Sequence, residues 1–99
     1  MWYAILGEDN DDSLPLRAKT RDAHLARVKA LVAEGRVLIA GPHPAIDAED
    51  PGAAGFSGSL IVAEFSSLDE ARQWADADPY IEAGVYRNVT VKPFKLVLP

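Results

Sequence analysis

The stretch Ser59-Leu60-Ile61-Val62-Ala63-Glu64-Phe65, followed almost at once by Ser67-Leu68-Asp69-Glu70, decides the fold. Its first part is a short apolar run, which predicts a buried strand. Its second part is a capping box, in which a serine and a glutamate three residues later satisfy the first N–H groups of a helix. The sequence therefore predicts a strand that leads directly into a helix, and we expect this helix to end at Asp78.

The first half of the chain also places a strand before a helix. Residues 2–6 are aromatic and aliphatic and end at Gly7, which predicts a buried strand. A helical stripe of apolar residues then runs to Gly35, a residue type common just after a helix ends. Residues 36–41 predict a second strand, which we expect to stop at Gly41-Pro42.

The start of the first helix is open to two interpretations. Ser13 could cap a helix that carries Pro15 in its first turn, where proline is tolerated. Thr20 could instead cap a shorter helix, with Asp22 well placed near the positive N-terminal end. We favour Thr20, with a turn or a short helix before it.

A last strand is predicted from Tyr86 to Leu98, interrupted near Pro93, so the elements follow the order β-α-β-β-α-β. This order predicts an α+β, ferredoxin-like fold with a four-stranded antiparallel sheet and both helices on one face. The strands at residues 2–6 and 59–65 are apolar almost throughout, so both of their faces require cover. Because the helices cover one face only, we expect a homodimer in which the sheet of a second copy covers the other.

The chain has the size and composition of one soluble domain, spanning residues 1–99. Its net charge of −5 at pH 7 opposes non-specific binding to nucleic acid, which needs a basic surface. The absence of cysteine excludes disulfides and thiolate chemistry. The first residues lack the basic segment of a signal peptide, and no apolar run is long enough to span a membrane, so we expect a cytoplasmic protein.

Asp78 occupies a position that predicts an apolar side chain. Leu68, Ala71, Ala75 and Asp78 have the i, i+3, i+7, i+10 spacing of one helix face. Proline follows at position 79, so we expect the carboxylate at the C-terminal end of the helix, where its charge opposes the helix dipole. An inward acid needs a partner, and His24, on the inward edge of the first helix, is the suitable one.

A pair formed by His24 and Asp78 predicts general acid–base catalysis. A histidine exchanges protons near neutral pH, and a carboxylate beside it can orient the ring and stabilise the imidazolium. We therefore expect His24 to accept and donate the proton and Asp78 to orient its ring. A hydrogen-bonded but inert histidine packed at the helix edge remains the alternative.

Five further residues are expected to bind substrate around this pair: Arg21, Gly41, Pro42, Ser59 and Tyr80. Two others stay open. Arg17 could bind an anionic substrate oxygen, but a solvated arginine on the helix surface is the favoured interpretation, and His43 lies in a loop rich in proline and glycine. The two histidines lack the spacing of a metal-binding motif, and we expect neither a metal nor a cofactor.

Short motifs are spread over the whole chain: Arg21-Asp22-Ala23-His24-Leu25, Ala40-Gly41-Pro42, Asp50-Pro51-Gly52-Ala53-Ala54-Gly55-Phe56, Ala75-Asp76-Ala77-Asp78-Pro79-Tyr80 and Val91-Lys92-Pro93-Phe94. Together they resemble the YciI-like family. The resemblance implies a dimeric α+β barrel, in which two ferredoxin-like sheets pack face to face. It also implies an active site built around a histidine and an aspartate, which correspond to His24 and Asp78. It supplies no substrate.

Two functions from different classes fit these observations. The first is a cofactor-free enzyme that uses His24 and Asp78 for proton transfer, as an elimination or isomerisation, on a small organic, cyclic or phenolic molecule. The second is a non-catalytic dimer that binds a small molecule in regulation. The turnover of an enzyme should follow the titration of the histidine, whereas a binder should change its affinity without forming product.

Overall fold

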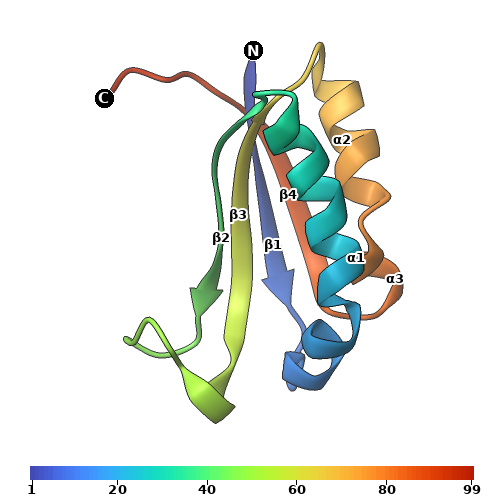
Figure 1. Ribbon diagram of the computed structural model, residues 1–99, viewed down its shortest axis with the longest axis vertical. Coiled ribbons are helices and arrows are strands. Elements are labelled where there is room, and N and C mark those ends of the chain that lie inside the picture. The colour runs from blue at the N-terminus through green and yellow to red at the C-terminus, as the bar shows by residue number, and fades with distance from the viewer.

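A computed structural model describes all 99 residues and has the expected α+β order with an antiparallel sheet. The elements are β1 (Trp2–Asp9), α1 (Leu14–Ala33), β2 (Val37–Pro44), the 3-10 turn η1 (Gly52–Ala54), β3 (Phe56–Glu64), α2 (Leu68–Asp76), α3 (Pro79–Glu82) and β4 (Tyr86–Phe94). The helices lie together on one side of the sheet, as Figure 1 shows. The predicted ferredoxin-like arrangement of strands and helices is therefore confirmed.

The sheet has the strand order β2-β3-β1-β4, and each pair of neighbours is antiparallel. The two central strands, β1 and β3, are paired in register with Ile5 opposite Ile61. Side chains alternate along a strand, so these two isoleucines share the face that packs against Val28 and Leu31 of α1. Burying a side chain of this size stabilises the fold by about 1.5–3 kcal/mol, so this layer holds the helices on the sheet.

The first helix begins at Leu14, so the prediction of a start at Thr20 is wrong. Pro15 lies in the first turn, where its missing N–H has no intrahelical partner to lose. Ser13 stands at the N-cap position but its hydroxyl donates to Asp9 at 2.5 Å instead of capping the helix. As a consequence His24 lies well inside the helix, beyond the first turn in which the helix dipole acts.

The second helix ends at Asp76, so the prediction that it continues to Asp78 is also wrong. Asp78 instead has extended backbone angles (φ −63°, ψ 128°), as expected for a residue before proline, and it caps the short helix α3. Its carboxylate accepts a hydrogen bond from the backbone N–H of Tyr80 at 2.9 Å. The charge therefore lies at the N-terminal end of a helix, where carboxylates are favoured.

Three strands are longer than predicted. β1 continues past Gly7 to Asp9. β2 continues past Gly41-Pro42 to Pro44, because it is an edge strand and a proline there can turn its missing N–H away from the sheet. β3 begins at Phe56 instead of Ser59, which shortens the loop after β2. β4 ends at Phe94, so the prediction that it resumes after Pro93 and reaches Leu98 is wrong. The reason is that its partner β1 begins at Trp2, opposite Phe94, and leaves no strand to pair with beyond it. No helix of the chain is long and apolar enough to cross a membrane.

Candidate active site

A cavity of about 260 Å³ lies between α1 and the strands β2 and β3, and the start of α3 closes one side. His24 and all five residues expected to bind substrate line it: Arg21, Gly41, Pro42, Ser59 and Tyr80. Leu25, Val28 and Ile61 give it an apolar wall. A larger hollow of about 610 Å³ around Arg36 and Trp74 contains no histidine. The smaller cavity is therefore the candidate site.

His24 and Asp78 are in contact at this cavity. The Nδ1 atom of His24 lies 2.9 Å from Oδ1 and 2.8 Å from Oδ2 of Asp78, and both side chains are buried. A carboxylate only accepts hydrogen bonds, so Nδ1 carries the hydrogen and donates it. In the neutral ring the lone pair then lies on Nε2, which makes no hydrogen bond within the chain. The expected contact is present, and its catalytic role remains a prediction.

Tyr80 fixes the orientation of the histidine ring. The two rings stack with their centroids 4.0 Å apart and an angle of 5° between their planes. Tyr80 is only 2% exposed, and burial, ahead of the nearby charges, raises the pKa of its phenol. Because Asp78 binds both the backbone N–H of Tyr80 and the ring of His24, the start of α3 determines where the imidazole lies.

Arg17 is buried, so the expectation of a solvated surface arginine is wrong. Its Nε and Nη2 atoms donate to the two carboxylate oxygens of Asp9 at 2.6 and 2.9 Å, and Nη2 also donates to the carbonyl of Gly58 at 3.1 Å. Burial alone would lower the pKa of Arg17, but the hydrogen bond and charge of Asp9 raise it overall. The guanidinium thus stays charged inside the fold.

Asp9 was missed because it lies in a run of acidic residues that looks like a solvated loop. It is the last residue of β1 and is buried. The alternation of Ile5, Gly7 and Asp9 along the strand is the signal that could have placed it on the face toward the helices. The mutual neutralisation of Asp9 and Arg17 explains how both charges remain inside the protein.

Tyr86 is the second residue that sequence reasoning missed. Its hydroxyl forms a hydrogen bond with the hydroxyl of Ser59, and burial, the largest cause, raises the pKa of its phenol to about 12. The ring lies against Gly7, where an added Cβ would come within 2.6 Å of it. Glycine at that position therefore makes room for the ring that reaches Ser59.

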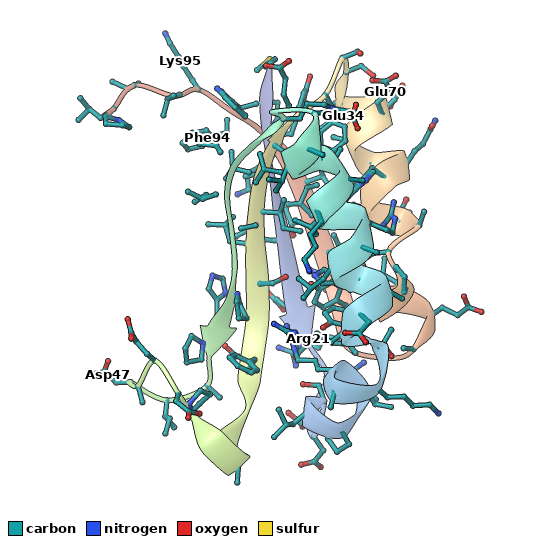
Figure 2. The ribbon with its side chains drawn as sticks, in the orientation of Figure 1. Arg21, Glu34, Asp47, Glu70, Phe94 and Lys95 are labelled. Atoms are coloured by element: carbon teal, nitrogen blue, oxygen red, sulfur yellow. The ribbon has the colours of Figure 1, made fainter.

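The remaining predicted residues lie at the mouth of the cavity or outside it. Arg21 is exposed and forms no ion pair, and Figure 2 shows it on the side of α1 that faces the sheet. Gly41 and Pro42 are exposed on β2. His43 does not line the cavity. No three histidine or acidic side chains gather where they could hold a metal ion.

The YCII-related domain matches residues 1–95 of the chain. The chain is 60% identical over 97 residues to Protein YciI of Escherichia coli O6:H1, covering 98% of this chain and 99% of that protein. It is 54% identical over 97 residues to an uncharacterised protein of Haemophilus influenzae, with the same coverage of both.

Two solved structures have a similar backbone. One is 5-chloro-2-hydroxyhydroquinone dehydrochlorinase from Burkholderia phenoliruptrix in complex with 2,5-dihydroxybenzoquinone. It has a TM-score of 0.83 and 26% identity, and the match covers 96% of this chain and 94% of that one. The other is protein Atu4242 from Agrobacterium tumefaciens, with a TM-score of 0.51 and 19% identity over 96% of this chain and 92% of that one, which shows the fold alone.

Proposed function

We propose that this chain, which belongs to the YCII-related domain family, is a cofactor-free enzyme that transfers a proton on a small ring compound. The observation that carries the proposal is the hydrogen bond from Nδ1 of His24 to buried Asp78, which leaves Nε2 free as a base at the cavity. The similarity to a dehydrochlorinase supports an elimination as the reaction class.

His24 Nε2 removes a proton from a C–H bond beside a carbonyl or from a phenol, and the electron pair it leaves moves toward a ring oxygen. In an elimination this pair returns to form a double bond while the leaving group departs with its own bonding pair, for example as chloride. In an isomerisation the imidazolium returns the proton to another atom. Asp78 stabilises the imidazolium, which in the elimination finally passes its proton to water.

The cavity supports a single-ring substrate. Its volume of about 260 Å³ is below the roughly 300–1,000 Å³ typical of pockets for drug-sized ligands. Leu25 and Val28 offer an apolar wall for the ring, while Arg21, which has no acidic partner, can attract an anionic substituent at the mouth. At Gly41 no atom lies within 4 Å of the position that a Cβ of this residue would occupy. This open space allows the substrate ring to approach the backbone of β2 closely.

The test begins with a screen of small acids, lactones and phenols for ligands that raise the melting temperature, and continues with turnover assays of the hits. His24→Ala should abolish turnover. His43→Ala is the matched control, because His43 lies outside the cavity and should leave turnover unchanged. Ligands that bind without ever forming product would contradict catalysis and favour the non-catalytic, ligand-binding dimer.

We also propose that the chain forms a homodimer by stacking the bare faces of two sheets. Leu6 and Leu60, which are opposite each other on that face, are only half-buried, and Ile39 is 53% exposed. Phe94 lies on the side of the sheet away from the helices in Figure 2. A soluble monomer rarely exposes several large apolar side chains together on one face of a sheet. Light scattering should give twice the 10.7 kDa chain mass, and Leu60→Glu should lower it; a monomeric wild type would contradict the proposal.

A further inference from the structure

Arg17 has donors that the fold does not use. Its Nε and Nη2 atoms bind Asp9 and Gly58, whereas Nη1 makes no hydrogen bond and is not among the polar atoms sealed inside the protein. Arg17 lines the same cavity as His24. It lies seven residues earlier on α1, which places its backbone about 10 Å along the helix axis from the base. Because Nε and Nη2 are engaged by Asp9 and Gly58, Nη1 is the donor that Arg17 has left for a ligand in this cavity.

Ser59, which lines the same cavity, offers a second donor. Its hydroxyl is paired with that of Tyr86, and either oxygen can be the donor. A phenol is the stronger donor of the two, so we assign the donated hydrogen to Tyr86 and the accepting oxygen to Ser59. The hydrogen of Ser59 is then free to point into the cavity, which Ser59 lines. Arg17 is bound to the carbonyl of Gly58, the residue just before Ser59, so the two donors belong to one stretch of β3.

We infer that Arg17 Nη1 and Ser59 Oγ form an oxyanion site, which binds the substrate oxygen that becomes negative when His24 removes the proton. Fixed donors aimed at developing charge are a main source of catalysis. The inference rests on the proposed function and narrows the substrate to rings with a carbonyl or phenolic oxygen across from the reacting proton. Tyr86 and Asp9 are positioning residues, because they act through Ser59 and Arg17.

The charge around the site favours an oxygen over a larger anion. Asp9 already balances the charge of Arg17, so the one unpaired positive charge that lines the cavity is that of Arg21 at its mouth. A single unpaired charge gives little preference for a phosphate or a dicarboxylate. A ring oxygen that carries a single negative charge needs only two or three hydrogen bonds. The free hydrogens of Nη1 and Ser59 Oγ supply that number.

The test compares two probes of similar shape in the intact protein. 2,5-Dihydroxybenzoquinone has two vinylogous acid groups, so near neutral pH it carries one delocalised negative charge on each side of the ring, whereas hydroquinone is neutral. Binding is measured by absorbance and calorimetry for wild type, Ser59→Ala, Tyr86→Phe and the double variant. Ser59→Ala should weaken binding of the anion about 10- to 100-fold, as expected for one hydrogen bond to a charged group, and change that of hydroquinone much less.

The Tyr86→Phe variant tests whether Tyr86 acts by positioning the hydroxyl of Ser59. If Tyr86 acts through Ser59, the double variant should bind the anion no more weakly than Ser59→Ala alone. Additive losses, an equal loss for both probes, or no binding of the anion by wild type would each overturn the inference. Arg17→Lys, checked for an intact thermal transition, should also weaken binding of the anion selectively. The inference about the oxyanion site is overturned by the binding measurements alone, whereas the proposed function is overturned by the turnover of the His24 variants, so the two failures are distinguishable.

Discussion

Replacing Asp78 with asparagine should stop proton transfer while leaving the protein folded. The carboxylate has two tasks, since it accepts the Nδ1 hydrogen of His24 and the backbone N–H of Tyr80. Asparagine caps helices about as well as aspartate, so the second task survives. The first does not, because an amide that turns its NH₂ group toward Nδ1 moves the ring hydrogen to Nε2 and removes the base. Loss of a correctly placed base costs about 10²- to 10⁴-fold in rate.

The effect of this change on stability can be ranked against Asp78→Ala. Asp78→Asn gives up a hydrogen bond between a buried charged group and His24, worth about 1.5–3 kcal/mol, but no longer has to bury a charge, so we expect a loss of about 1–2 kcal/mol. Asp78→Ala also loses the cap of α3, which adds about 1 kcal/mol. Urea unfolding of both variants and turnover of the same substrate provide the assay. Turnover of Asp78→Asn within threefold of wild type, or equal destabilisation by both changes, would refute the reasoning.

Three further predictions test the surroundings of the site. Gly7→Ala should cost about 1–3 kcal/mol in urea unfolding because its Cβ would collide with the Tyr86 ring, whereas Gly41→Ala, which meets no atom, should change stability by less than about 0.5 kcal/mol. The pKa of Tyr86 is raised from 10.0 to about 12, so the neutral phenol stabilises the fold fully below pH 10, and this contribution is lost as the pH rises toward 12. Over that range the free energy of unfolding of Tyr86→Phe should fall by about 2–3 kcal/mol less than that of wild type. Arg17→Met should lower the free energy of unfolding by about 3–5 kcal/mol, because it leaves Asp9 unpaired. Adding Asp9→Leu should recover much of this loss, and a double variant no more stable than Arg17→Met would show that the broken ion pair is not its cause.

The order of elements could be read from the sequence because each is marked by local physics. The apolar runs at residues 2–6 and 59–65 and the capping box at Ser67 need no information from elsewhere in the chain. The boundaries were harder. Whether Ser13 or Thr20 precedes the first helix depends on Asp9, which takes the Ser13 hydroxyl as a partner and belongs to another element. Local rules contain no such contact.

The candidate site was also predicted only in part, because some of its residues are positioned by contacts between elements. His24 and Asp78 were found because an acid on an apolar helix face requires a partner, even though the helix in question ends earlier than expected. Arg17 was misjudged, because its burial depends on Asp9, at the end of a strand eight residues away. The contact between Tyr86 and Ser59 depends on the absence of a side chain at Gly7. Pairs formed between elements become visible only when the sheet is assembled.

The most direct test of the account is the rate of chloride release from 5-chloro-2-hydroxyhydroquinone, measured with wild type, His24→Gln and His43→Gln at equal protein concentration. Glutamine keeps much of the size and polarity of histidine but cannot act as a base at neutral pH. We predict release by wild type and His43→Gln at equal rates, and a loss of about 10²- to 10⁴-fold in His24→Gln. Equal rates for His24→Gln and wild type, or binding of the compound by wild type without chloride release, would contradict the claim that His24 catalyses the elimination.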